Sequence, residues 1–366
     1  MKLNKLILDN FRNYNDLDIT FDKDVVCFTG LNGQGKTNLI EAISVLGLLN
    51  SFRTNNYDEM KKFGEEYFFI SGEFTDKNDN RLSIKISYSD KKKKVTFQDK
   101  KILKFSDFWG NIPIVYLIPD ESVITTGPPL ERRKFVDKLL SMIDREYFSL
   151  LKNYSKIIKQ KNKILFDLKK ENSFQTEMID VYNDQIVLYG SKLFEKRVEF
   201  LKGFEKFFKD ILIFISDGLF GGSISYSSEM DQKSYSSDLR EKLSVNKRTE
   251  VYRGLSIIGP HKDDLIFDIN GNDLRKYGSK GQHKLFLVAL KLSEIKYIKS
   301  ITDEYPVFLL DDLYSEIDEK KSAKIAKILD EDIQTFITTS NSGIIKQFDQ
   351  NNTKIFNVIN GAVNLV

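Results

Sequence analysis

Residues 30–37 decide the fold, and they run Gly30-Leu31-Asn32-Gly33-Gln34-Gly35-Lys36-Thr37. The stretch matches the pattern G-x-x-x-x-G-K-[ST], whose backbone N–H groups enclose the phosphates of a nucleotide. An apolar run at 25–29 predicts a buried strand before it, and helical spacing at 38–49 predicts a helix after it. In that setting Lys36 neutralises the β and γ oxygens, and Thr37 supplies a hydroxyl to Mg²⁺. The sequence therefore predicts an α/β fold with a P-loop whose eight residues bind ATP with Mg²⁺.

A second apolar strand is expected at 306–310, and it ends in two carboxylates, Asp311 and Asp312. A carboxylate at the end of such a strand lies near the Mg²⁺ of a P-loop ATPase. We therefore expect Asp311 to support Mg²⁺ and Asp312 to face the attacking water. The alternative is an ordinary strand that meets a turn, so this assignment depends on the other motifs.

The segment 277–284 runs YGSKGQHK and opens a helix expected at 285–298. Ser279, Gly281 and Gln282 place a hydroxyl and exposed amides at that helix N-terminus, which suits a γ-phosphate. The alternative is a simple cap, in which Ser279 satisfies the first helical turn.

The composition narrows the class of protein. The 366 residues carry 56 basic and 53 acidic side chains, so with a net charge of +3 any attraction to nucleic acid must come from local patches. Cys27 is the only cysteine, which excludes an internal disulfide, fits a cytoplasmic protein and favours a place in the core. Of the two histidines, His261 is expected to be a structural turn residue, and metal binding should use oxygen ligands. No apolar run reaches the roughly 18 residues of a membrane span.

Sequence periodicity predicts two structural parts. We expect an ATPase domain formed by 1–120 and 254–366, with a mixed central sheet and an antiparallel β flank at 66–105. An α-helical lobe is expected to be inserted at 121–253.

Within the lobe, a heptad-like rhythm at 151–200 predicts a short antiparallel helix hairpin with arms of about 20 residues and a turn at 171–176. Lys161 and Lys196 interrupt its apolar seam. An ordinary helical lobe is the alternative.

Several cations have two possible roles. The run 91–94 is either a phosphate contact or a solvated hairpin tip. Arg132, Arg133 and Lys134 could bind DNA or the partner lobe, or form an exposed helix face. Arg12 could touch ATP or form a surface ion pair.

The three phosphate-site motifs resemble the P-loop, paired carboxylates and signature loop of ABC-type ATPases, and Ser315-Glu316-Ile317-Asp318 resembles their D-loop. Three further stretches narrow the resemblance to the RecF family of bacterial recombination-repair ATPases: LDNFRNY at 8–14, TGPPLERRKFVD at 126–137, and GPHKDDL through LRKYGSKGQ at 259–282. Heads of the SMC and Rad50 group share the first motifs, but very long coiled coils separate their two halves.

The resemblance implies an ABC-type ATPase head with an inserted helical lobe. It further implies an ATP-induced head-to-head dimer, in which Ser279, Gly281 and Gln282 of one copy cap the γ-phosphate held by the other. It also implies DNA binding, RecR and RecO as partners in loading the RecA recombinase, and a cytoplasmic, nucleoid-associated protein.

Three positions depart from the ABC pattern. Pro119-Asp120-Glu121 contains no Q-loop glutamine, Thr338-Thr339-Ser340 contains no switch histidine, and Asp312 replaces the catalytic glutamate. We therefore expect slow, DNA-stimulated ATP hydrolysis. Two other classes remain open: a small-molecule phosphotransferase, which needs no second subunit, and a soluble ABC transporter subunit, which should carry both the glutamine and the histidine.

Overall fold

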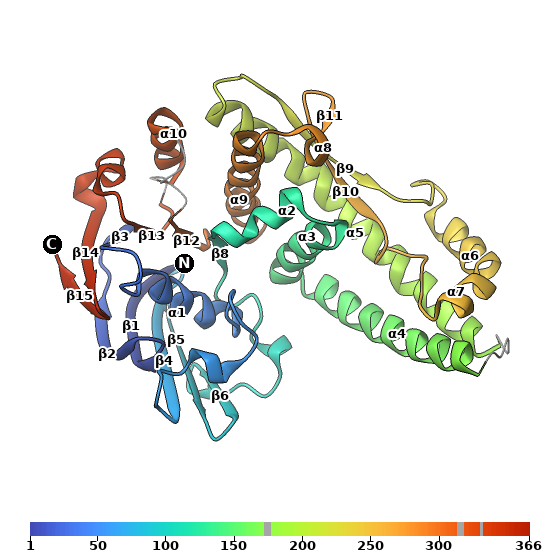
Figure 1. Cartoon of the computed structure of the whole chain (residues 1–366), viewed down its shortest axis with the longest axis horizontal. Helices are drawn as coiled ribbons and strands as arrows, with labels where there is room; N and C mark the ends of the chain where they lie inside the picture. The colour runs from blue at the N-terminus through green and yellow to red at the C-terminus, as the bar shows by residue number, and fades with distance from the viewer. Residues whose placement is uncertain (172–176, 313–317, 330–331) are drawn as a thin grey trace. The chain divides into compact units, whose positions relative to one another are not determined.

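Figure 1 shows the computed structural model, which describes residues 1–171, 177–312, 318–329 and 332–366. The chain divides into two compact units. Unit 1 comprises Met1–Ser122, Ile211–Leu219 and Leu287–Val366, and unit 2 comprises Val123–Asp210 and Phe220–Phe286. Residues 254–286, expected in the ATPase domain, group with unit 2 because β10 (Asp264–Ile269) pairs there with β9 (Gly222–Ser227).

The central sheet of unit 1 has six strands in the order β15-β14-β3-β13-β12-β8. They are β3 (Val25–Thr29), β8 (Ile114–Leu117), β12 (Val307–Asp311), β13 (Thr335–Thr339), β14 (Thr353–Ile359) and β15 (Ala362–Leu365). All neighbours are parallel except β14 with β15. Strands β12 and β13 are buried throughout, which explains their continuous apolar sequences. Helix α1 (Lys36–Leu48) packs against both.

The second sheet of unit 1 is antiparallel, with the order β2-β1-β4-β5-β6-β7. Its strands are β1 (Lys2–Phe11), β2 (Tyr14–Thr20), β4 (Tyr67–Thr75), β5 (Arg81–Ser89), β6 (Lys92–Phe97) and β7 (Lys100–Lys101). The predicted β flank is therefore present, and the N-terminal strands extend it. One hydrophobic core joins both sheets and α1 through buried side chains such as Leu6, Ile40, Phe74 and Phe336.

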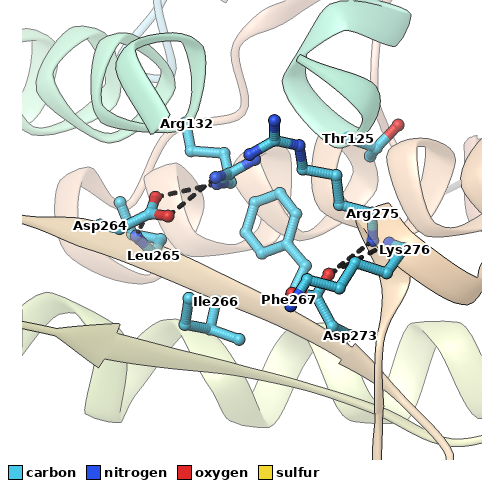
Figure 2. Close-up of a pocket in the computed structure, with 9 residues that line it drawn as sticks. All are labelled: Thr125, Arg132, Asp264, Leu265, Ile266, Phe267, Asp273, Arg275 and Lys276. Atoms are coloured by element: carbon cyan, nitrogen blue, oxygen red, sulfur yellow. Dashed lines mark hydrogen bonds and ion pairs between the residues drawn. The ribbon is translucent and has the colours of Figure 1, made fainter. Parts of the chain in front are cut away.

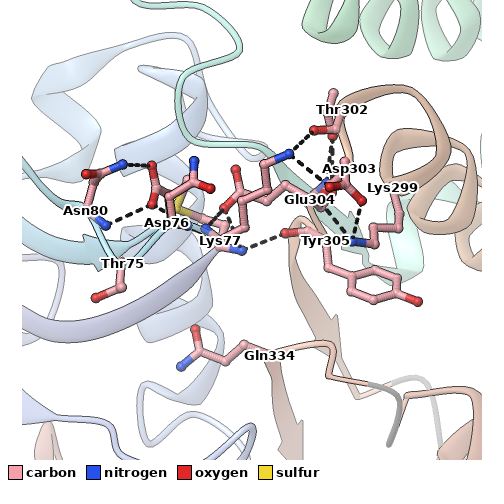
Figure 3. A network of polar contacts seen from close by, with 12 residues as sticks. Thr75, Asp76, Lys77, Asn80, Lys299, Thr302, Asp303, Glu304, Tyr305 and Gln334 are labelled. Carbon is pink, nitrogen blue, oxygen red and sulfur yellow. Dashed lines mark hydrogen bonds and ion pairs between the residues drawn. The ribbon is translucent and has the colours of Figure 1, made fainter.

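The N-terminus is held inside unit 1 by a polar network (Figure 3). The ammonium of Met1 donates to the carbonyl of Tyr305 and pairs with Glu304, each at 3.0 Å. Lys77, in the turn after β4, pairs with Asp303 at 3.1 Å. These contacts connect the β flank to the segment that enters β12, so the flank and the central sheet form one body.

The shorter elements of unit 1 complete its surface. They are η1 (Tyr57–Met60), η2 (Phe105–Asp107), η3 (Pro119–Ser122), α10 (Glu319–Leu329), η5 (Ser342–Gln347) and η6 (Gln350–Asn352). Cys27 is buried in β3, where burial raises the pKa of its thiol to about 12. Its expected place in the core is confirmed.

Unit 2 combines helices with a three-stranded sheet in the order β11-β10-β9. Its other elements are α2 (Val123–Thr126), α3 (Pro129–Ile143), α4 (Arg145–Lys170), α6 (Tyr235–Val245), α7 (Lys247–Arg253), β11 (Asn272–Asp273) and α8 (Leu274–Tyr277). Two helices, α5 (Glu177–Ile215) and α9 (Lys280–Thr302), continue from unit 2 into unit 1. No helix in the described part of the chain combines the length and apolar character needed to cross a bilayer.

Helices α4 and α5 form the predicted antiparallel hairpin (Figure 1). At one end Arg197 of α5 donates to the hydroxyl of Tyr147 in α4 at 3.0 Å, and at the other Leu165 and Ile179 share a buried cluster. The arms have 26 and 39 residues, so the expected length of about 20 was too short. The apolar spacing continues past 200, and α5 continues with it. Most of the predicted turn at 171–176 lies outside the described residues.

The two seam lysines are held by carboxylates. Lys161 and Glu250 are both fully buried and form an ion pair of 2.5 Å between α4 and α7. Lys196 is partly exposed and pairs with Asp144 at 2.8 Å and Glu146 at 2.7 Å. Polar residues are therefore tolerated in this seam because each has a charged partner.

The segment GPHKDDL at 259–265 ties several elements of unit 2 together. Tyr154 Oη lies 2.6 Å from His261 Nδ1, and His261 Nε2 lies 3.3 Å from the carbonyl oxygen of Ser256. Burial lowers the pKa of His261 to about 3, so the ring is neutral, with the tautomer that accepts at Nδ1 and donates at Nε2. The structural role expected for His261 agrees with this environment.

Asp263, in the same segment, is a buried carboxylate that accepts three hydroxyl hydrogen bonds. The donors are Ser228 at 2.7 Å and Tyr226 and Tyr235, each at 2.8 Å. Burial raises the pKa of Asp263, while the three hydroxyls favour its charged form. The segment thus fastens β9 and α6 to the start of β10.

Candidate nucleotide-binding site

The P-loop connects β3 to α1 and depends on glycines with positive φ. Gly30, Gly33 and Gly35 have φ values of 138°, 81° and 112°. A Cβ on Gly30 would lie 2.4 Å from the carbonyl oxygen of Val358. A Cβ on Gly35 would lie 2.4 Å from the side-chain nitrogen Nδ2 of Asn13. Gly30 and Gly35 are therefore required both by the backbone conformation and by the lack of space.

The ammonium of Lys36 points back into this loop. The residue is only 6% exposed and donates to the carbonyls of Gly30 at 2.7 Å and Leu31 at 2.9 Å. Burial lowers the pKa of Lys36, and the negative charges of Asp312 and Asp311 oppose that shift. The predicted cation and both predicted carboxylates therefore belong to one electrostatic cluster.

Thr37 and Asp311 are in direct contact. Thr37 Oγ1 donates to Asp311 Oδ1 at 2.9 Å, and Thr338 Oγ1 donates to the same oxygen at 2.5 Å. Asp311 and Thr338 are register partners in β12 and β13, and β3 is the next strand. Because parallel strands present their carboxyl ends at one edge of the sheet, these residues converge at that edge.

Asp312 occupies an unusual backbone position beside Asp311. Its φ is 44°, a region uncommon for residues other than glycine. Its N–H donates to both the carbonyl oxygen and Oγ1 of Thr338, at 3.2 and 3.1 Å. Thr338 thus positions both carboxylates. Residues 338–340 drew attention in the sequence only because they contain no switch histidine, so the role of Thr338 in positioning the carboxylates was not predicted.

The turn between β1 and β2 supports the P-loop from outside. Tyr14 Oη donates to the carbonyl of Gly35, and Asn13 Nδ2 donates to the carbonyl of Gln34, each at 3.1 Å. Asn38 Nδ2 in α1 donates to Asn13 Oδ1 at 2.8 Å. The stretch LDNFRNY contains Asn13 and Tyr14, but the sequence alone did not indicate that they hold the loop.

Arg12, in the same stretch, forms an internal ion pair. Its Nε and Nη2 donate to the carboxylate of Glu41 at 2.9 and 2.5 Å, and the Glu41 side chain is fully buried. Ser51 Oγ also donates to that carboxylate at 2.5 Å, and Arg53 lies 3.6 Å from it. Arg12 therefore neutralises a buried charge of α1 instead of forming a surface ion pair, and its expected contact with ATP stays a prediction.

Glu121 stands where a Q-loop glutamine was sought, and it faces α9. Lys291 Nζ lies 3.1 Å from Glu121 and 2.7 Å from Glu294, and Lys291 is 1% exposed. Burial disfavours the ammonium, but the two carboxylates outweigh it and raise the pKa of Lys291. Glu121, Lys291 and Glu294 therefore form a buried group of three charges where an ABC ATPase has a neutral glutamine.

The signature-like loop begins α9 in unit 2. Gln282 N donates to Ser279 Oγ at 3.3 Å, and Ser279 N donates to Gln282 Oε1 at 2.8 Å, which is a reciprocal capping box. Ser279 and Gly281 are exposed, Gln282 is partly buried, and a Cβ on Gly281 would meet only open space. Ser279 is therefore a helix cap whose hydroxyl hydrogen is still able to donate to an anion.

Several other predicted residues have structural contacts. In the D-loop only Asp318 lies within the described residues, and it accepts from Lys321 N at 3.0 Å. Arg133 donates to the carbonyl of Asp263 at 2.6 Å, and Lys134 alone of the 132–134 cluster is on an exposed face, paired with Glu131 at 2.8 Å.

Lys91 lies in the turn between β5 and β6, and the rest of the 91–94 run begins β6. Asp90 and Lys91 have φ values of 50° and 58°, as a tight hairpin requires. Lys93 Nζ lies 4.4 Å above the ring of Tyr57 and donates to the carbonyl of Leu49 at 2.6 Å. The run therefore begins at a hairpin, but Lys93 is held by contacts within unit 1 and is not simply solvated, and the phosphate contact stays a prediction.

The donor set at the sheet edge fits a hard divalent cation. Thr37 and Asp311 offer hydroxyl and carboxylate oxygens, which Mg²⁺ prefers, and it commonly binds through one or two protein ligands together with phosphates. Across the described ranges, no group of three or more histidine, cysteine or acidic side chains could hold a metal by itself. The residues present therefore fit a metal that is shared with a nucleotide.

The fold and the phosphate-site motifs define an ABC-type ATPase head. A crystal structure described as the SMC head bound to the C-winged helix domain of ScpA matches all of this chain and 97% of that chain, with a TM-score of 0.59 at 16% identity. A second SMC head, bound to ScpA derived from Pyrococcus furiosus, gives a TM-score of 0.57 at 17% identity. The predicted fold class is confirmed.

The chain belongs to the RecF family. The family model for the RecF/RecN/SMC N terminal domain matches residues 2–364. The DNA replication and repair protein RecF of Oceanobacillus iheyensis is 34% identical over 100% of both chains, and that of Clostridioides difficile is 35% identical over 99% of this chain and 98% of its own. A solved structure of the recombination mediator protein RecF-ATP in the RecFOR pathway has a TM-score of 0.88 at 29% identity, covering 100% of this chain and 97% of that one.

Proposed function

We propose that this chain is an ATP-dependent DNA-binding protein of recombinational repair and replication-fork maintenance, in which ATP fastens two copies together. The observation that carries the proposal is the meeting of Lys36, Thr37, Asp311 and Asp312 at the carboxyl edge of one parallel sheet. A P-loop cation, a hydroxyl and two carboxylates are the groups that phosphoryl transfer to water requires. The family of the chain supports ATP as the nucleotide.

The residues of unit 1 have separate roles in this proposal. Backbone N–H groups of 30–35 enclose the phosphates, and Lys36 neutralises the β and γ oxygens. Thr37 and Asp311 would hold Mg²⁺, which supplies positive charge to the same oxygens. Thr338 fixes Asp311 by its 2.5 Å hydrogen bond, and Asp312 orients or deprotonates the attacking water.

The residues of unit 2 act in trans. Ser279 and Gly281, with the amide of Gln282, cap the γ-phosphate held by the other copy, so two identical composite sites form with C₂ symmetry. The exposure of Ser279 and Gly281 at the start of α9 supports this role. Hydrolysis separates the copies. We expect it to be slow because Asp312 is one methylene shorter than glutamate and 338–340 contains no histidine.

The cellular part of the proposal draws on the relatives. Solved relatives are described as recombination mediators in the RecFOR pathway. We propose that the ATP-bound dimer binds duplex, gapped or junction DNA in the cytoplasm at the nucleoid, acts with RecR and RecO, and helps to load RecA. DNA is expected to stimulate ATP hydrolysis.

Light scattering tests the proposal directly. We expect a monomer without nucleotide or with ADP, and a dimer with ATP and Mg²⁺. Duplex DNA should bind best with ATP, and more weakly as salt rises, because phosphate contacts release counterions. A mass that is independent of nucleotide, together with DNA affinity that is insensitive to ATP, would contradict the proposed ATP-induced dimer.

A further inference from the structure

Unit 2 contains a cavity of about 260 Å³ enclosed by α2, α3, α8 and strands β10 and β11 (Figure 2). The side chains that matter for its chemistry are Arg132, Asp264, Phe267, Asp273, Arg275 and Lys276. None of them belongs to the P-loop or to the paired carboxylates of unit 1. The cavity therefore needs an explanation of its own.

Arg132 forms a fixed wall of this cavity. Its Nε and Nη2 donate to the carboxylate of Asp264 at 3.0 and 2.8 Å, and Nη1 donates to the carbonyl of Gly127 at 3.0 Å. The guanidinium also lies 5.8 Å from the ring centroid of Phe267, and the residue is only 4% exposed. Three of its five N–H donors are used. The guanidinium is thus held in place with donors left over.

Two more cations line the cavity, and neither is neutralised. The side chain of Arg275 points towards Arg132 in Figure 2. No hydrogen bond or ion pair joins the side chain of Arg275 or Lys276 to another described residue. The nearby carboxylate of Asp273 is engaged instead by the backbone N–H groups of these two residues, at 2.9 and 3.3 Å.

The charges lining the cavity therefore do not balance. Asp264 compensates the charge of Arg132, and Asp273 accepts the backbone N–H groups of α8. The charges of Arg275 and Lys276, which also line the cavity, therefore have no carboxylate partner in the described part of the chain. Like charges that converge in a cavity repel each other and attract an anion strongly, because the low-dielectric walls focus the field. Guanidinium groups in addition match the oxygens of a phosphate in a bidentate manner.

We propose that this cavity binds the phosphate group of a phosphate ester, through Arg275, Lys276 and the remaining donors of Arg132. The volume of about 260 Å³ is below the usual range for whole drug-sized ligands, roughly 300 to 1,000 Å³. It suits a phosphate and an attached sugar better than a complete nucleoside triphosphate. The phosphate could come from a nucleic-acid strand or from a free small molecule, and the two sources can be separated experimentally.

The test uses the full-length chain carrying Lys36→Ala, so that the P-loop does not contribute its cation. Calorimetric titrations with inorganic phosphate, pyrophosphate and a short oligonucleotide with or without a 5′ phosphate measure binding. Arg275→Gln with Lys276→Gln is then added to that background and should weaken binding at least about tenfold. Thermal unfolding checks that each variant is folded, which is expected because both side chains are exposed.

The matched control replaces two exposed lysines of α4, Lys156→Gln with Lys159→Gln, and removes the same charge elsewhere in unit 2. This control should bind like the Lys36→Ala parent. Binding of phosphate or pyrophosphate identifies a free phosphate ligand, and binding only of the 5′-phosphorylated strand identifies nucleic acid. No binding in the Lys36→Ala background, equal binding after Arg275→Gln with Lys276→Gln, or an equal loss in the control would overturn the proposal. None of these results depends on ATP-induced dimerisation.

Discussion

The hydroxyl of Thr37 donates a hydrogen bond of 2.9 Å to the carboxylate of Asp311, a residue 274 positions further along the chain. Thr37 lies in the first turn of α1, and Asp311 ends β12. The contact joins the two parts of the chain that the helical lobe interrupts. Folding of both parts around one sheet is therefore needed before these two oxygens come together.

Replacing Lys36 with alanine should weaken ATP binding at least about tenfold and abolish ATP-dependent association, because the phosphates lose their P-loop cation. Fluorescence titration measures the affinity, and light scattering measures the mass. Lys36→Arg is the matched control for charge, and it should retain part of the affinity. Unchanged affinity and dimerisation in Lys36→Ala would remove the central assignment of the site.

Replacing Thr338 with valine keeps the size of the side chain but removes its hydroxyl. Asp311 then loses its 2.5 Å donor and Asp312 N–H loses one acceptor, so we expect a loss of about 1 to 3 kcal/mol in stability. ATP turnover should fall more than ATP affinity, since the carboxylates lose their alignment. Urea unfolding and steady-state ATPase assays measure the two effects. Thr338→Ser, which keeps the hydroxyl, should behave like the wild type.

Ser279 variants separate a helix cap from a trans phosphate contact. Ser279→Asp preserves an N-cap but sets a carboxylate towards the partner's γ-phosphate, so it should block dimerisation and leave stability nearly unchanged. Ser279→Arg should block dimerisation by its bulk, while ATP still binds to the monomer.

Mixing Ser279→Arg with Lys36→Ala provides the decisive measurement. A mixed dimer has one composite site with both lesions and one with neither, so part of the ATPase activity should return. If the mixture stays inactive at concentrations where the wild type dimerises, the site is not shared between copies.

The buried ion pair in the helical hairpin should be sensitive to removal of one partner. Lys161→Met leaves Glu250 without its cation in a fully buried position, and we expect a loss of about 3 to 5 kcal/mol in stability. Adding Glu250→Gln to that variant should recover part of the loss, because no unpaired charge remains. Chemical denaturation of both single variants and the double variant measures the coupling. Strictly additive losses would show that the two side chains do not act as a pair.

His261 should make stability depend on pH below neutrality. Burial lowers its folded-state pKa to about 3, whereas the unfolded value is about 6.5, so only the unfolded state binds a proton between these values. The contribution is complete above about pH 6.5 and declines as pH falls towards 3, which amounts to about 2 kcal/mol between pH 7 and pH 5. Urea unfolding at these two pH values measures the loss. His261→Gln should show a smaller difference between pH 7 and pH 5, and an unchanged difference would assign the effect to other groups.

Local sequence patterns were enough to predict part of the site. Glycines at 30, 33 and 35 followed by Lys36 and Thr37 specify a phosphate-binding turn, because its backbone conformation excludes most side chains. The apolar run that ends at Asp311 predicted a buried strand. The heptad-like rhythm predicted the hairpin, although the C-terminal extension of α5 was missed.

Contacts between side chains far apart in the sequence could not be predicted, because they depend on how the segments pack. Thr338 positions Asp311 and Asp312 because β12 and β13 are register partners, and Arg12 reaches Glu41 because the β1–β2 turn lies against α1. The cavity in unit 2 likewise combines residues of α3, β10 and α8, and the sequence pattern of one of these elements does not predict its contact with the others. The periodicity of a segment shows which of its faces is buried. It does not show which other segment covers that face, because this depends on the packing of the whole folded chain.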